Sequence, residues 1–235
     1  MMLRIDLQFF GGRGASSGGG SGGSAKGELK LPDGTKVEFE GELKFGADDP
    51  VVTGKTRQVI TDWEGKRVKA KIEYGYAVDA DGNPVGSEVR GGKGSVRTPY
   101  SYHGEGTTFT HIHPRGDGML GGTFSGADMR NFANTKNKTT RAAAKEGTYS
   151  ISKGANFDRA GFNAYVVKAD ANFKKVYREK DKVAFEQYKT GKMSYNDYKL
   201  ANAKAFNTAL VQLHNDYSAG QKQFGYTYTL EKRGG

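Results

Sequence analysis

Apolar and polar residues alternate along several short stretches of the chain, and a period of two is typical of half-buried β-strands. Residues 28–46 alternate around a Pro-Asp-Gly turn, which predicts a β-hairpin. Residues 71–89 predict a strand, an Asp-Gly-Asn-Pro turn and a returning strand. Between these two, 56–71 predicts a short helix that leads into a strand. Further strands are predicted at 106–113, 147–152 and 163–169.

Helix signals fall between and after these strands. Ser125, followed three residues later by Asp128, forms a capping box and predicts the start of a helix. Beyond Ala169 the pattern turns helical, and Ser194 with Asp197 predicts a second helix start. Apolar residues recur behind it at helical spacing, namely Tyr198, Phe206, Ala209, Leu210, Leu213 and Tyr217. The mixture of strands and helices predicts an α/β (α+β) fold.

Composition divides the chain into four segments. They are a leader with a Gly/Ser-rich linker at 1–27, a hairpin at 28–50, a central domain at 51–169 and a basic helical extension at 170–235. The absence of cysteine excludes disulfides, cysteine-ligated zinc, iron–sulfur clusters and a thiol nucleophile. The longest apolar run falls well short of the roughly 20 residues that span a bilayer, so no membrane partner is expected.

The net charge of +10 favours an anionic partner. The sequence nevertheless contains no RNA-binding signature, no zinc finger and no run of five basic residues. Nucleic acid is therefore a possible partner with only weak support, and the excess of lysine also serves solubility.

The leader contains the stretch LQFFGGRGASSG, which resembles the N-termini of head-region proteins encoded by phages and prophages of Gram-positive bacteria. The resemblance implies a phage context, with the leader docking on phage head proteins. It places the protein in the host bacterial cytoplasm or in the virion. The leader is short and is interrupted by Asp6, so we do not expect it to act as a secretory signal peptide.

The stretch HIHPRGDGMLGGTFSGAD, residues 111–128, holds the candidate chemistry. His111 and His113 are two residues apart on a predicted strand, so both imidazoles face the same side, and imidazole nitrogen suits zinc. Asp128 would approach from the first turn of the next helix. Three protein ligands leave one position open, as in catalytic zinc sites. Each feature also has a plainer interpretation, because the histidines could be exposed and Asp128 could serve only the capping box with Ser125.

The combination of His-x-His-Pro, a loop and Ser-x-x-Asp resembles the signature of the JAB/MPN family of metalloenzymes, the JAMM proteases with their RadC-like members. The resemblance implies a JAB/MPN-like mixed sheet flanked by helices, over roughly residues 56–169. It implies that His111, His113 and Asp128 bind zinc and that Ser125 helps to stabilise the oxyanion. A glutamate on an earlier strand would act as general base. The implied reaction is hydrolysis of an amide bond in a peptide or protein substrate, by a metallopeptidase or isopeptidase.

Three glutamates precede the histidines closely enough to be that base: Glu64, Glu73 and Glu88. Glu73 is our choice, because it lies where a predicted helix runs into an apolar strand and a turn, which is the family context. Glu88, in a glycine-rich segment, is second. The loop from Arg115 to Phe124 holds ten residues, where the family usually has about six. A longer loop could reshape substrate access or could keep Asp128 from the metal.

Two other interpretations remain open. A cupin would use the same histidine pair with Asp117, but it needs a further histidine on a later strand, and His214 falls in the helical extension, where we expect it on a helix surface. The other is a non-enzymatic phage head-associated or host-directed binding protein that retains the fold and uses its basic surface, with nucleic acid as one candidate ligand. Bound metal would distinguish an enzyme from this second alternative.

Overall fold

The structure is a computed structural model that describes residues 26–46, 52–116 and 118–233. The predicted leader and nearly all of its linker lie outside the described residues, as does Asp117. Among the described helices, none is both long enough and apolar enough to cross a membrane.

A mixed sheet of six strands forms the centre of the described chain, in the spatial order β4-β3-β5-β6-β7-β8. Its strands are β3 (Tyr74–Val78), β4 (Val89–Arg90), β5 (Thr108–Ile112), β6 (Thr139–Ala143), β7 (Gly147–Lys153) and β8 (Tyr226–Lys232). Strands β5 and β6 are parallel, and all other neighbours are antiparallel. A separate hairpin pairs β1 (Lys26–Lys30) with β2 (Lys36–Glu40). The fold is therefore mixed α/β, as the sequence predicts.

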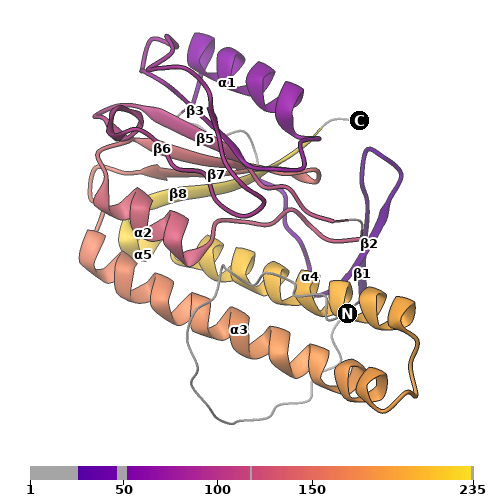
Figure 1. The fold of residues 1–235 in the computed structure, drawn as a ribbon. Coiled ribbons are helices and arrows are strands. Elements are labelled where there is room, and N and C mark those ends of the chain that lie inside the picture. Colours follow the sequence, from indigo (N-terminus) through magenta and orange to yellow (C-terminus); the bar gives the residue numbers. More distant parts are fainter. Residues whose placement is uncertain (1–25, 47–51, 117, 234–235) are drawn as a thin grey trace.

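Helices cover both faces of the sheet (Figure 1). Helix α1 (Gly54–Arg67) lies on one face. The other face carries α2 (Gly126–Asn134), α3 (Arg159–Lys189), α4 (Tyr195–Ala219) and the short α5 (Gln221–Phe224). A 3-10 turn, Tyr100–His103, precedes β5. The hairpin is tied to α4, because the Thr208 hydroxyl accepts from the Glu40 backbone N–H at 3.0 Å.

The larger apolar core lies between the sheet and α2, α3 and α4. Its largest members include Phe124, Met129, Phe132, Phe162, Phe173, Phe206, Leu210, Leu213, Tyr217 and Leu230. Burial of side chains of this size is the main stabilising contribution in a domain, at about 1.5–3 kcal/mol each. Because this core joins β7 and β8 to α4, the C-terminal segment packs directly on the sheet.

The structure confirms most of the predicted elements. The helix before β3, strands β5 and β7, and the helix after Ser125 all form where expected. The hairpin also forms around the predicted turn, but its second strand ends at Glu40 and residues 41–46 are irregular. The long helix capped by Ser194 also forms, and the Ser194 hydroxyl accepts from the Asp197 N–H. The returning strand predicted at the end of 71–89 is mostly irregular, and only Val89 and Arg90 pair with β3, as β4.

The predicted strand at 163–169 is wrong, because these residues belong to α3. Two adjacent valines suggested a strand, but Val166 is fully buried whereas Val167 is 57% exposed. The buried positions Phe162, Val166 and Ala169 are four and three residues apart, which is helical spacing. The Asp158 carboxylate accepts from the Gly161 N–H and so caps the helix before this stretch.

Two strands were not predicted. β8 lies within the segment expected to be a helical extension, yet it pairs along its whole length with β7. Its buried residues alternate as Tyr226, Tyr228 and Leu230, a strand pattern that follows directly on a helical one. The sequence pattern did not predict β6, because its central residue is Arg141, and arginine is rarely found in a buried strand. The predicted boundary after residue 169 falls inside α3.

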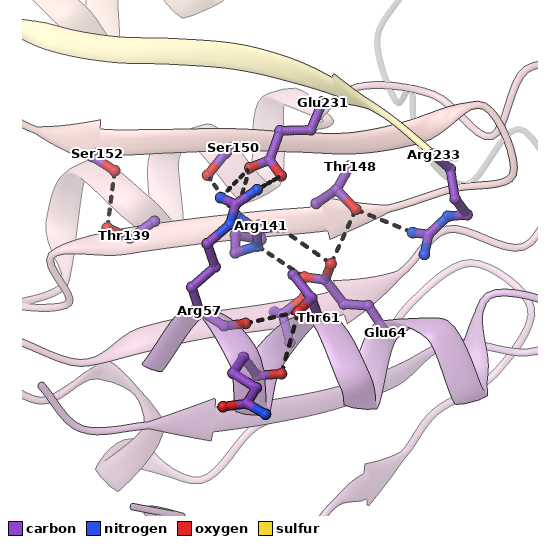
Figure 2. A network of polar contacts seen from close by, with 12 residues as sticks. Arg57, Thr61, Glu64, Thr139, Arg141, Thr148, Ser150, Ser152, Glu231 and Arg233 are labelled. Carbon is purple, nitrogen blue, oxygen red and sulfur yellow. Dashed lines mark hydrogen bonds and ion pairs between the residues drawn. The ribbon is translucent and has the colours of Figure 1, made fainter. Parts of the chain in front are cut away.

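The face of the sheet beneath α1 is polar, and ion pairs hold the helix there (Figure 2). Glu64 of α1 and Arg141 of β6 are both buried, with Nε of Arg141 at 2.8 Å from Oε1 of Glu64. The Thr110 hydroxyl donates to the same Glu64 oxygen at 2.8 Å. Nη1 of Arg141 lies 3.0 Å from Oε1 of Glu231, and Arg57 bonds the other oxygen of Glu231 at 2.7 Å. The sheet therefore has one polar, ion-paired face and one apolar face.

Candidate metal centre

The three predicted ligands come together on the face of the sheet opposite α1. His111 is in β5 and His113 directly follows it, and both side chains are buried. Their Nε2 atoms are 2.8 Å apart. Oδ1 of Asp128 lies 3.7 Å from Nε2 of His111, and Oδ2 lies 3.8 Å from Nε2 of His113. One ligand atom from each residue falls within 4.8 Å of the other two, which is the clustering that a single metal ion requires.

The hydrogen bonds that cap α2 also hold the Asp128 carboxylate beside the two histidines. Oδ2 of Asp128 accepts from the Ser125 N–H at 2.8 Å and from the Ser125 hydroxyl at 2.7 Å. The Ser125 Oγ in turn accepts from the Asp128 N–H at 3.1 Å. Phe124 and Met129, on either side of the cap, are fully buried. The capping box thus fixes the first turn of α2 and directs the carboxylate towards the histidines.

His113 is held in the tautomer that a metal ligand needs. Its Nδ1 lies 2.9 Å from the Gly122 carbonyl oxygen, which can only accept, so Nδ1 carries the proton. In the neutral ring, the lone pair is then on Nε2, which faces His111 and Asp128. Burial lowers the pKa of His113 to about 3, so the ring stays neutral near physiological pH. An imidazole N–H bonded to a carbonyl is the usual support for a histidine that binds metal.

The charges of His111 and Asp128 support each other. Burial alone would lower the pKa of His111, but the Asp128 carboxylate, with smaller contributions from Glu73 and the Arg141 backbone, raises the pKa overall. Burial alone would raise the pKa of Asp128, but His111 and the other hydrogen-bonding neighbours hold it well below its usual value. The ring of Phe109 stacks on His111, with the centroids 5.4 Å apart and the planes 7° from parallel. Asp128 is therefore an anion that faces two imidazoles.

Glu73 is the glutamate that lines the same cavity. It directly precedes β3, and its backbone is bonded on both sides, from its N–H to the Gly92 carbonyl at 2.7 Å and from the Gly91 N–H to its carbonyl at 2.8 Å. The cavity has a volume of about 300 Å³, and its walls include Glu73, His111, Ser125 and Asp128. Burial raises the pKa of Glu73 to about 7, which suits a group that exchanges protons near neutrality.

The other two glutamates are engaged elsewhere. Glu88, the second choice, accepts from Nε of Arg67 at 2.7 Å and from the Trp63 indole N–H at 2.7 Å. Its pKa is lowered, with the hydrogen bond from Arg67 as the main cause, so it stays a paired carboxylate. Glu64 belongs to the ion-paired face beneath α1. Within the described chain, neither of them lines the cavity.

The long loop before Ser125 is anchored by side chains that the sequence did not single out. Asn207 of α4 accepts from the Leu120 N–H at 2.9 Å and donates to the Gly118 carbonyl at 2.9 Å. The buried Glu146 carboxylate accepts from the next two backbone N–H groups, those of Gly121 and Gly122. No motif marks Asn207 or Glu146, because their partners lie far away or in an irregular loop. The loop brings Asp128 to the histidines despite its length.

His214 is buried rather than on a helix surface, which corrects the prediction. Its Nε2 lies 2.9 Å from the Lys44 carbonyl, and its Nδ1 lies 2.8 Å from the Tyr228 hydroxyl. Because the carbonyl only accepts, Nε2 is the donor and Nδ1 accepts from Tyr228. Burial lowers the pKa of His214 to about 4. Both ring nitrogens are thus used in packing α4 against β8 and the segment after the hairpin, and His214 offers no support for a cupin-type site.

The donor set fits zinc. It comprises two imidazole nitrogens and one carboxylate oxygen, which are ordinary zinc ligands, and three protein ligands leave a tetrahedral position for water or substrate. The Gly122 carbonyl supplies the outer support for His113. Comparisons with protein-family models, with curated proteins and with solved structures found no match to this chain. The fold and the site define a mixed α/β protein with a buried His-His-Asp cluster beside a separate glutamate.

Proposed function

We propose that the protein is a zinc-dependent hydrolase of amide bonds, a metallopeptidase or isopeptidase of the JAB/MPN type. The observation that supports this most is that Glu73, His111, Ser125 and Asp128 line one cavity, and that His113 completes the cluster with His111 and Asp128. These residues lie in or directly beside β3, β5 and α2, so the grouping is a product of the fold rather than of one local motif. The substrate class is a peptide or a protein.

Glu73, Ser125 and the three clustered residues each have a part in this proposal. Zinc, when bound, lowers the pKa of a water molecule towards neutrality and polarises a carbonyl group. Glu73 accepts a proton from the attacking water and returns it to the leaving amine as the C–N bond breaks. His111, His113 and Asp128 hold the ion. The Ser125 hydroxyl donates to Asp128 in this structure, so its proton has to turn towards the substrate before it can bind an oxyanion.

The replacement Glu73→Gln tests this assignment directly. We expect zinc stoichiometry to be unchanged, because Glu73 is not one of the clustered ligands, and kcat for peptide or isopeptide hydrolysis to fall by at least about 10²-fold. Zinc content is measured by elemental analysis and kcat with labelled peptide and isopeptide substrates. Glu88→Gln is the matched control and should retain activity. Full activity in Glu73→Gln would show that Glu73 is not the base.

The raised pKa of Glu73 also predicts how stability depends on pH in the metal-free protein. Its pKa is about 7 in the folded protein against an ordinary 4.5, so the folded state holds a proton that the unfolded state has released. Stability therefore falls as pH rises from about 4.5 to 7 and stays at the lower level above that range. The free energy of unfolding of Glu73→Gln, taken relative to that of the wild type, should increase by up to about 3 kcal/mol from pH 4.5 to pH 8. Urea unfolding at the two pH values measures the change.

The biological setting is also a proposal. The N-terminal resemblance supports a phage-encoded protein that acts in the host cytoplasm or in the virion, with the leader docking on phage head proteins. The docking segment lies outside the described residues. Co-purification of full-length protein, but not of protein lacking residues 1–10, with phage heads would support the docking.

A second, non-enzymatic candidate function is binding of nucleic acid, and the outer face of α3 favours it. Lys175, Arg178, Lys182 and Lys189 are all exposed and follow one another at intervals of three, four and seven residues, so they share one side of the helix. Phe185 lies on the same side and is 43% exposed. Such a row of cations matches a phosphate backbone.

The salt dependence of binding tests this candidate. We expect Lys175→Gln with Lys182→Gln to weaken binding to duplex DNA of mixed sequence and to reduce the slope of log affinity against log salt by about 2. Fluorescence anisotropy between 50 and 300 mM salt (~6-fold range) gives the slope. Lys66→Gln with Lys69→Gln removes the same charge from exposed positions at the C-terminal end of α1 and just after it, and is the control. Equal slopes in all three proteins would exclude α3 as the binding face.

A further inference from the structure

A buried carboxylate holds the loop that supports the candidate metal centre. Glu146, in the turn between β6 and β7, is only 3% exposed. Its Oε2 accepts from the Gly121 N–H at 2.9 Å, and its Oε1 accepts from the Gly122 N–H at 3.0 Å. The Tyr149 hydroxyl donates to the same Oε1 at 2.9 Å. Three donors to a buried carboxylate fix it in one position, because hydrogen bonds to a charged group are strong where water is excluded.

Gly122 links this carboxylate to the histidine pair. The Gly122 N–H bonds Glu146, and the carbonyl of the same residue accepts from Nδ1 of His113 at 2.9 Å. Gly122 has φ +101°, in the left-handed region that favours glycine, and a Cβ there would lie 2.8 Å from Cδ1 of Leu210. The neighbouring Gly121 packs so closely that a Cβ would lie 2.3 Å from Cβ of Ala144. The direction of the Gly122 carbonyl thus depends on how its own amide is held.

We propose that Glu146 is a positioning residue of the metal centre. It fixes the backbone amides of Gly121 and Gly122, and the Gly122 carbonyl then sets the tautomer and the orientation of His113. The proposal deepens the proposed function and relies on it only in taking zinc as the ligand of the cluster. It also gives the long loop a role, because the residues added between Pro114 and Ser125 bring two consecutive amides to one buried carboxylate.

Asn207 provides a matched comparison within the same loop. It is fully buried and also bonds the loop backbone, at Gly118 and Leu120. Its loop bonds end before the amides that Glu146 holds, and neither Gly118 nor Leu120 adjoins the Gly122 carbonyl that bonds His113. Asn207 also donates to the Glu38 carbonyl of the hairpin. A general loosening of the loop should follow from removing either residue, whereas loss of control over His113 should follow from changes at Glu146.

The experiment compares Glu146→Gln and Asn207→Ala with the wild type. Glutamine keeps the shape of Glu146 but turns an NH₂ group towards a backbone N–H, so that one acceptor is lost. We expect Glu146→Gln to fold and to weaken zinc affinity by about 10–100-fold, the range typical of lost outer support for a ligand. Asn207→Ala should lower the melting temperature and leave zinc affinity within about threefold. Zinc affinity is measured by competition with a chromophoric chelator.

A second measurement needs no metal. Nitrogen-15 NMR of the metal-free protein reports the histidine tautomers, and wild-type His113 should carry its proton on Nδ1. Glu146→Gln should give a mixture of tautomers, and Asn207→Ala should not. If the wild type binds no zinc, the proposed function fails, and the tautomer still tests Glu146. Unchanged affinity and tautomer in folded Glu146→Gln, or equal changes in Asn207→Ala, would overturn the proposal.

Discussion

The replacement His113→Ala should abolish tight zinc binding, and so should Asp128→Asn. Each variant leaves two of the three clustered ligands, and each lost ligand is expected to weaken zinc affinity by about 10³-fold, or roughly 4 kcal/mol. Asp128→Asn is the more conservative change, because an asparagine still accepts in the helix cap while losing the charge that faces the imidazoles. Hydrolysis should disappear with the zinc in both variants.

Thermal unfolding gives an independent measure of the same loss. A ligand that binds only the folded state stabilises it by about 2.7 kcal/mol at a concentration one hundred times its Kd. We therefore expect zinc to raise the melting temperature of the wild type and of Glu73→Gln, and to leave that of His113→Ala unchanged. His214→Gln is the control, since His214 is also buried but bonds Lys44 and Tyr228 rather than the cluster. Wild-type affinity in His113→Ala would place the zinc elsewhere.

Local signals account for the parts of the structure that the sequence predicted correctly. The helix start at Ser125 depends on a residue only three positions away, and the spacing of His111 and His113 depends only on the period of a strand. The same signals placed Asp128 in the first turn of α2, from which it reaches the histidines. Glu73 was selected because its context matches that of the glutamate in the family that the sequence resembles, and it lines the cavity together with His111 and Asp128.

The errors and omissions arise where distant partners decide the structure. Val166 and Val167 favour a strand by propensity. The helix forms instead because it buries Val166 in the core that α2 and α4 share with the sheet. Arg141 made β6 look unlike a buried strand because its partner, Glu64, is 77 residues earlier in the chain. Glu146 carries no signal at all, since its role consists of bonds to the backbone of a glycine-rich loop. Such pairings cannot be read from one local stretch of sequence.

Removing the side chain of Arg141 should cause the largest loss of stability. Arg141 and Glu64 are 0% and 1% exposed, so Arg141→Ala leaves a buried carboxylate without its ion-pair partner. Arg233, which also interacts electrostatically with Glu64, offsets part of the loss. Breaking a buried pair in this way typically costs about 3–5 kcal/mol. The Thr110 and Thr148 hydroxyls still donate to Glu64 and offset part of the cost. Urea unfolding at pH 7 measures the difference from the wild type.

A double replacement distinguishes the cost of an unpaired charge from a loss of packing. Arg141→Met with Glu64→Leu removes both charges and keeps apolar volume, and we expect most of the lost stability to return, because apolar substitutes for a buried ion pair are often neutral or better. Arg57→Ala is the matched control: Arg57 bonds Glu231 with a side chain that is 26% exposed, so its loss should cost about 1 kcal/mol or less. Zinc stoichiometry should be unchanged throughout, because Arg141 faces α1 and the histidines face α2. If the stability losses of Arg141→Met alone and Glu64→Leu alone add up to the loss in the double replacement, the two ions do not act as a pair.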